Sequence, residues 1–262
     1  MESSVQPDCW PGESTAPRPT REAADEQTVF GAVGQDLSTP VAALTRTAEQ
    51  LIEDLEVLQA DQVHELASVI HAGALGLHVL VENLLAAATI RAGRLHLQTQ
   101  PVHLLDVVNE IRPMVTPMLA LRAQPLQLRS RRGLPYVSAD SHRIGQVLTT
   151  LISNASSVTE RGQPVTLWLS REGPAVRVTV TDRGPRIPGR FAPFHQGSES
   201  EASRDDGLLL RLAVVKAIIE AHCGAVGAQN RRGGGACFWF ELTAQDDEHN
   251  AVRAYHLERM PV

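Results

Sequence analysis

The sequence is poor in cysteine and aromatic residues and carries no excess of positive charge. Its 262 residues include three cysteines, too few and too scattered for a disulfide framework or a zinc ribbon. The 24 Lys and Arg residues are outnumbered by 30 Asp and Glu, and no basic stripe stands out, so we expect no nucleic-acid partner. No run approaches the roughly 18 apolar residues of a membrane span, and no signal peptide opens the chain. We therefore expect a cytoplasmic protein without direct membrane insertion.

The two ends of the chain are polar and lack hydrophobic periodicity. Residues 1–24 contain four prolines among Ser, Glu and Thr, a composition that predicts a disordered tail. Residues 245–262 are also polar, and we expect a C-terminal tail there. Between the tails lie two regions with different patterns, at 25–92 and 95–244.

Residues 25–92 have the apolar spacing of two long helices. Apolar side chains recur in steps of three and four, and a short break near residue 60 separates two seams. Pro40 lacks a backbone donor and is expected to bend the first helix. A single hairpin cannot cover both apolar stripes, so we expect a second copy to complete a dimeric four-helix bundle. The first seam contains Phe30, Val33, Leu37, Val41, Leu44, Ala48, Leu51, Leu55 and Leu58; the second contains Val63, Leu66, Ile70, Gly73, Leu77, Leu80 and Leu84.

Residues 95–244 mix strand-like and helix-like segments. Strands are expected at 165–170, 176–181 and 236–243, with Gly173 and Pro174 forming the hairpin turn between the first two. Amphipathic helices are expected at 142–158 and 208–221. Antiparallel strands with interspersed helices indicate the α+β class.

Six short motifs stand in these regions. They are GQDLSTP at 34–40, RIGQVLTTLISNASSVT at 143–159, VTDRGPRIP at 180–188, FAPF at 191–194, GLLLRLAVVKAIIEAHCG at 207–224 and GGGACFWFEL at 233–242. In this order, from about residue 26 to 243, the chain resembles the catalytic core of sensor histidine kinases. That family joins a dimerisation and histidine-phosphotransfer hairpin to a Bergerat-type α/β sandwich ATPase domain. The resemblance implies ATP and Mg²⁺ as cofactors. It also implies a response regulator as partner, and either a homodimer or a heterodimer with another histidine kinase.

The phosphoacceptor segment departs from the family pattern. The resemblance places Gln35 in the slot of the phosphorylated histidine, and a carboxamide is no nucleophile. Asp36 matches the adjacent acid, and Thr39 matches the residue that orients water when such kinases dephosphorylate their regulator. We therefore expect no autophosphorylation here. Three histidines spaced by seven residues are expected on a solvated flank of the second helix rather than as displaced acceptors: His64, His71 and His78.

The nucleotide-binding motifs are partly retained. By resemblance, Asn154 binds the magnesium ion, Asp182 accepts a hydrogen bond from the adenine amino group, and Gly184 follows in the first glycine box. Thr150 and Ser157 stand where the family carries an acidic or polar residue and a phosphate-facing cation. Simpler structural roles stay open: Asn154 as a partner of a neighbouring loop, and Asp182 as the cap of a turn into Gly184.

The second glycine box has lost most of its glycines. Gly207 remains, while Leu209 and Arg211 replace the other two glycines of the family pattern. Their Cβ atoms restrict both positive φ angles and close approach of the backbone to a triphosphate. The run of leucines at 208–210 could instead extend the following helix. We therefore expect weak or absent ATP binding.

The leading hypothesis is a degenerate histidine kinase, a pseudokinase that acts by dimerisation and partner docking. Two enzyme hypotheses stay open, a response-regulator phosphatase and a divergent ATP-binding kinase or ATPase. A third hypothesis is an interaction module of the Bergerat superfamily, such as a sigma-factor sequestering protein, but that class usually lacks a long helical hairpin.

Overall fold

The computed structural model describes residues 21–187 and 206–245. Side chains are described from Leu37 onward in the first range, and in the second they are not described for Asp206, Gly207 and Leu209. The aromatic motif at 191–194 and most of the two predicted tails therefore lie outside the described residues.

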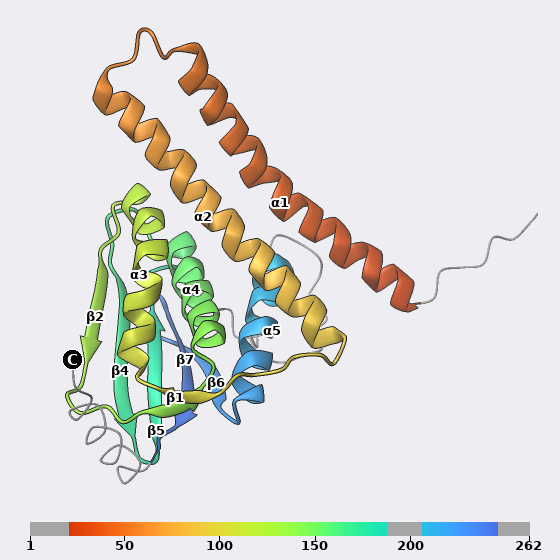
Figure 1. Ribbon diagram of the computed structural model, residues 1–262, viewed down its shortest axis with the longest axis vertical. Coiled ribbons are helices and arrows are strands. Elements are labelled where there is room, and N and C mark those ends of the chain that lie inside the picture. The colour runs from red at the N-terminus through yellow and green to blue at the C-terminus, as the bar shows by residue number, and fades with distance from the viewer. Residues whose placement is uncertain (1–20, 188–205, 246–262) are drawn as a thin grey trace, which may run out of the picture.

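Two long helices, α1 (Arg21–Glu53) and α2 (Ala60–Arg91), form a hairpin at the start of the described chain (Figure 1). The first helix begins at Arg21 rather than at the predicted residue 25, and Pro40 lies inside it. Because α1 ends at Glu53, Leu55 and Leu58 of the predicted seam lie in the turn instead of on the helix. The N–H of Gln59 donates to Oε1 of Gln62 at 2.9 Å, which satisfies a donor at the start of α2.

Helix α2 is more apolar than we expected from the sequence. Among the described helices, α2 has the length and the hydropathy (1.5 over an 18-residue window) that would allow it to cross a membrane. The expectation that no segment reaches this composition was wrong. The same composition occurs in helices that pack against other helices, and α2 contacts α1, α3, α4 and α5.

A mixed five-stranded sheet forms the second half of the chain, with the order β2-β4-β5-β7-β6. Its strands are β2 (Leu126–Ser130), β4 (Val165–Glu172), β5 (Ala175–Thr181), β6 (Ala225–Asn230) and β7 (Ala236–Thr243). The β2–β4 pair is parallel and the other pairs are antiparallel. Gly173 has a φ of +61° in the turn between β4 and β5, so the predicted hairpin turn is confirmed.

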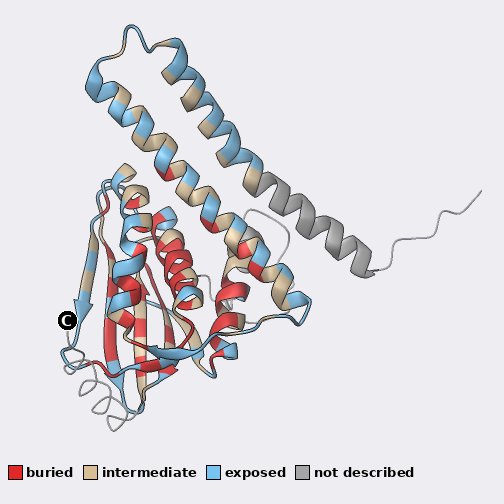
Figure 2. Ribbon diagram, viewed as in Figure 1, coloured by how far each residue is buried: buried red, intermediate tan, exposed pale blue. Residues whose placement is uncertain are grey.

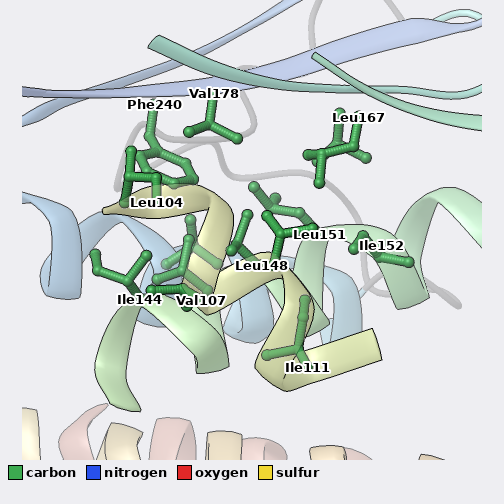
Figure 3. Packing of buried hydrophobic residues seen from close by; sticks show 14 of the residues in the cluster. Leu104, Val107, Ile111, Ile144, Leu148, Leu151, Ile152, Leu167, Val178 and Phe240 are labelled. Atoms are coloured by element: carbon green, nitrogen blue, oxygen red, sulfur yellow. The ribbon is translucent and has the colours of Figure 1, made fainter. Parts of the chain in front are cut away.

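Three helices cover one face of this sheet: α3 (Leu104–Leu121), α4 (Ser141–Val158) and α5 (Asp206–Ala221) (Figure 1). A small antiparallel pair, β1 (Gln100–Val102) and β3 (Val137–Ala139), lies beside them. Alternate residues of β5 are buried, as expected for a strand with one face on the core. Figure 3 shows side chains of α3 and α4, such as Leu104 and Leu148, pointing toward Leu167, Val178 and Phe240 of the sheet.

Burial is uneven between the two parts of the chain. Buried residues concentrate between the sheet and its helices, whereas most of the hairpin is exposed or half-buried (Figure 2). The hydrophobic core therefore lies mainly in the α/β domain (95–244). The hairpin (α1 and α2) is stabilised by contacts between its two helices and with the helices of that domain. The structure describes one copy of the hairpin, and the dimeric four-helix bundle stays a prediction.

Candidate nucleotide site and its junction with the hairpin

The helix that carries Asn154 begins at a well-defined cap. Oδ1 of Asp140 accepts from the N–H of Arg143 (3.1 Å), and Oδ2 accepts from the N–H of Gln98 (2.9 Å). Burial tends to raise the pKa of this carboxyl group, but the two N–H donors and the positive charge of Arg143 outweigh it and hold the pKa below its usual 3.8. The N–H of Asp140 in turn donates to Nε2 of His222 at 3.0 Å. These bonds fix the start of α4 against the end of α5.

Asn154 presents a buried amide with no partner. The residue is 5% exposed, and neither Oδ1 nor Nδ2 has a hydrogen-bond partner among the described residues. A buried amide left unsatisfied is costly, so the structure holds this side chain ready for an additional group. An amide oxygen is a suitable ligand for Mg²⁺, and the position therefore fits the metal that the resemblance implies. The alternative role, a bond to a neighbouring loop, has no counterpart in the described residues.

Asp182 and Gly184 form a tight turn at the end of β5. Oδ1 of Asp182 accepts from the N–H groups of Gly184 (2.8 Å) and Ala236 (3.0 Å), so the turn-capping role is present in the structure. Burial raises the pKa of this carboxyl group, an effect only partly offset by these donors and by Arg231. A Cβ at Gly184 would lie 2.6 Å from the carbonyl oxygen of Val158, so the close approach requires glycine. Because both bonds end on Oδ1, Oδ2 is the oxygen available to a ligand.

The second glycine box is helical. Helix α5 begins at Asp206, so Gly207 and the leucines that follow it already have helical backbone. Leu208 packs against the hydrophobic core and Leu212 is fully buried. The prediction that the leucine run extends the helix is confirmed. The N–H groups of the first turn, up to Leu209, have no partner within the helix, whereas those from Leu210 onward donate to a carbonyl one turn back. The first turn of α5 can therefore still present amides to a phosphate, but Arg211 and the residues after it cannot.

The other predicted site residues lie on the hairpin or at the surface of the α/β domain. Gln35 and Asp36 are on α1, and their side chains are outside the described residues. Thr39 is also on α1 and is exposed. Ser157, which stands in place of the phosphate-facing cation, is exposed as well, and so is Arg186 in the motif at 180–188. The three histidines of α2 are exposed, as the seven-residue spacing predicted: His64, His71 and His78.

The structure adds a buried polar junction that sequence reasoning missed. Asn83 of α2 is 1% exposed, and its Nδ2 donates to Oγ1 of Thr150 on α4 at 3.1 Å. The Thr150 hydroxyl lies 2.8 Å from the carbonyl oxygen of Gln146 and 3.2 Å from Oδ1 of Asn83. The Gln146 side chain donates to the carbonyl oxygen of Glu82 at 3.1 Å. Thr150, one turn before Asn154, therefore binds the hairpin. The signal in the sequence was an asparagine inside the apolar stretch of a long helix.

Comparison with known proteins agrees with this geometry. Residues 139–246 match the family of histidine kinase-, DNA gyrase B- and HSP90-like ATPases. The chain is 30% identical over 220 residues to an uncharacterised sensor-like histidine kinase of Rhizobium meliloti, an alignment that covers 81% of this chain and 42% of the relative. It is 31% identical over 222 residues to the sensor protein KdpD of Escherichia coli, covering 83% and 24% of the two chains. The chain carries a sensor histidine kinase core.

This histidine kinase core spans less than half the length of either relative. Its fold is also found in the histidine kinase ThkA, solved in complex with the response regulator TrrA, at a TM-score of 0.54 and 20% identity. That likeness covers 83% of this chain and 61% of ThkA, and it includes a helical region before the ATPase-like domain.

Proposed function

We propose that this two-component signalling protein has kept the histidine kinase fold, has lost the phosphoryl-transfer chemistry, and works by binding other signalling proteins. The observation that carries the proposal is the second glycine box, which starts at Gly207 and lies within helix α5, a helix that begins at Asp206. A kinase holds the triphosphate with backbone amides of a glycine-rich loop; here Leu209 and Arg211 replace two of its glycines, and the amides from Leu210 onward are bonded within the helix. The buried amide of Asn154 still suits a metal ion. The metal-binding residue is therefore retained, while the glycine box that would hold the phosphates is altered.

The acceptor end of the reaction supports the same proposal. Gln35 occupies the acceptor slot implied by the family resemblance, and its carboxamide cannot attack a phosphorus atom as imidazole does. The histidines of α2 are exposed on its flank, as a solvated stripe would be. Loss at both ends of the reaction favours a binding role over a slow kinase.

The uncovered apolar surface of the hairpin supports dimerisation as one binding activity. Only 17% of the most apolar window of α2 is buried within a single chain. Val81 and Leu85 of α2 are 40% and 59% exposed, and Val41 and Ile52 of α1 are 44% and 75% exposed. A second copy, or a related histidine kinase, would cover these side chains in a four-helix bundle. In this proposal, packing within the four-helix bundle explains why α2 is so apolar, and no membrane is needed.

Response-regulator docking is the second binding activity in this proposal. The ThkA structure, which shares this fold, contains a response regulator. By analogy we place the docking surface on α1 around Leu37 to Leu44, where Thr39 and Val41 are exposed. An inactive copy at this surface would hold a regulator without phosphorylating it.

The proposal is tested by incubating the purified protein with Mg²⁺ and γ-labelled ATP, beside the variant Gln35→His. We expect no acid-labile phosphate on either protein, because restoring the imidazole does not restore the phosphate loop. Acid-labile phosphate on the wild type would overturn the proposal. Label on Gln35→His alone would show that the nucleotide site works and that only the acceptor is lost.

A response-regulator phosphatase is a second candidate, because Thr39 is exposed on α1. Such a reaction needs a positioned hydroxyl and a docked partner rather than a histidine. The measurement is the decay of a phosphorylated regulator with wild type, Thr39→Ala and Thr45→Ala, a second exposed threonine of the same helix. Slower decay for Thr39→Ala alone would support this function, and equal decay for all three would remove it.

A further inference from the structure

The five-stranded sheet has a second face that the described helices leave open (Figure 1). The described helices α3, α4 and α5 lie on the opposite face, where the alternate residues Val176, Val178 and Val180 are buried. The outward residues line a groove of about 420 Å³ that runs over β2, β4 and β5 to Arg231. The groove lies on the sheet face opposite the helices, and its end at Arg183 and Arg231 adjoins the backbone of Asp182.

The strand register places an unusual row of residues across the middle of this face. Arg129 of β2 is opposite Trp168 of β4, which is opposite Thr179 of β5. Thr179 is opposite Trp239 of β7, which is opposite Gly227 of β6. Both tryptophans of the described chain therefore stand on an open sheet face, flanking a single strand. Tryptophan is usually well buried, yet Trp168 is 37% exposed.

The indole of Trp239 is held in place by its neighbours. A Cβ at Gly227 would lie 2.3 Å from the Trp239 ring, so this glycine leaves room for the ring across β6. On the other side, the Arg177 guanidinium lies 4.4 Å from the ring centroid and forms an ion pair with Glu241 at 2.6 Å. These contacts order Trp239 and Arg177, and Trp168 is left as the open aromatic surface.

The same groove gathers positive charge from distant parts of the sequence. It is lined by Arg129, Arg177, Arg183 and Arg231, against Glu172 as the one acidic residue of its lining. Among the described residues, only Arg177 of these four forms an ion pair with a carboxylate. The Arg231 guanidinium donates to the carbonyl oxygen of Asp182, and that of Arg183 donates to Gln163. The groove is therefore positive in a chain whose net charge is −6.

We propose that this open face is a docking surface for an acidic segment of a partner protein. Tryptophan and arginine are the side chains that contribute most to binding at protein interfaces, and here both kinds are exposed together. Carboxylates of the partner would pair with Arg129, Arg183 and Arg231, while an apolar side chain between them would cover Trp168. A nucleic acid is the less favourable polyanion, because Glu172 and Glu241 lie on this face and the net charge of the chain is negative.

The test uses a fluorescein-labelled peptide of alternating Glu and Leu, and measures its anisotropy against the full chain at low salt. We expect saturable binding that weakens about tenfold in Arg129→Glu and in Trp168→Ala. Arg112→Glu, a matched change at an exposed position of α3, should leave the affinity unchanged. Thermal unfolding of each variant checks that these surface changes leave the fold intact.

Three outcomes would overturn the proposal. The first is the absence of saturable binding, and the second is equal weakening by Arg112→Glu, which would mean that only overall charge matters. The third is tighter binding of single-stranded oligothymidine than of the acidic peptide, which would make the face a nucleic-acid surface.

Discussion

Nδ2 of Asn83 on α2 donates a hydrogen bond of 3.1 Å to Oγ1 of Thr150 on α4, across the junction between the hairpin and the α/β domain. Both residues are buried, so neither side chain can replace this partner with water. A buried polar pair of this kind specifies one arrangement of the surfaces that carry it, because other arrangements leave the amide unsatisfied. The junction therefore fixes how the α/β domain sits on the hairpin.

Breaking one side of this pair should destabilise the protein. We expect Thr150→Val to lower the free energy of unfolding by about 1–3 kcal/mol, because it leaves Nδ2 of Asn83 buried without its acceptor. Asn83→Leu should cost less, because the Thr150 hydroxyl keeps its bond to the carbonyl oxygen of Gln146. The double variant should lose less than the sum of the two, since both polar groups are then gone. Chemical denaturation measures all three.

The matched control for Thr150→Val is Thr89→Val. Oγ1 of Thr89 donates to the carbonyl oxygen of Leu85 on the exposed part of α2, just as Thr150 bonds Gln146 one turn back. We expect a change within about 0.5 kcal/mol. Equal losses at Thr89 and Thr150, or strict additivity of Asn83→Leu and Thr150→Val, would contradict the role given to the junction.

Two buried carboxyl groups of the α/β domain should respond oppositely to replacement by asparagine. Asp140 uses both oxygens to accept N–H groups, so an amide nitrogen at one of them would face a donor. Asp140→Asn should therefore lower the free energy of unfolding by about 1–3 kcal/mol at neutral pH. Asp182 uses only Oδ1, so Asp182→Asn keeps both bonds and should be neutral or stabilising.

The pH dependence of unfolding has opposite signs for these two groups. The pKa of Asp140 is lowered on folding, so its contribution is present above its usual pKa of 3.8 and is lost as the pH falls below that value. The pKa of Asp182 is raised by burial, so its contribution is present below 3.8 and is lost as the pH rises through the raised value. The free energy of unfolding should be measured between about pH 2 and 7 for wild type, Asp140→Asn and Asp182→Asn. Each variant should lose only the pH dependence that its own carboxyl group contributes. Parallel curves for wild type and both variants would refute this assignment.

Two glycines of α2 provide a test of the hairpin packing. A Cβ at Gly73 would lie 2.6 Å from Cδ2 of Leu44 on α1, whereas a Cβ at Gly76 meets nothing within 4 Å. We expect Gly76→Ala to raise the free energy of unfolding by up to about 1 kcal/mol through helix propensity. Gly73→Ala should give a smaller gain than Gly76→Ala, or a loss, because the Leu44 side chain must shift to make room. Equal gains would show that α1 does not pack on Gly73 as described.

The sequence predicted the elements whose patterns are local. The hairpin, the turn at Gly173 and helices α4 and α5 follow from periodicity and turn residues, and the kinase motifs supplied the order of the domains. Helix α3 was missed because Pro113 and Pro117 lie inside it and suggest a loop. Its buried side chains on the sheet outweigh the helix bonds that the prolines remove. Short strands such as β1 and β3 were missed because three residues carry too little pattern.

The sequence predicted which residues belong to the candidate site, but not how their side chains are bonded. The motifs pointed to Asn154 and Asp182, but only the folded chain shows that the amide of Asn154 is buried without a partner and that one oxygen of Asp182 holds a turn. Thr150 was interpreted through the family alone, whereas its partner Asn83 is 67 residues away in the sequence. The positive groove was also invisible, because its arginines come together only through strand register.

The most direct test of the central claim is a titration of the protein with a fluorescent ATP analogue in the presence of Mg²⁺. The account predicts no saturable binding in the micromolar range, and measurable binding only when Leu209→Gly and Arg211→Gly together restore the glycine pattern. Micromolar binding to the wild type that is abolished by Asn154→Ala would contradict it, because the helical glycine box would then hold a triphosphate after all.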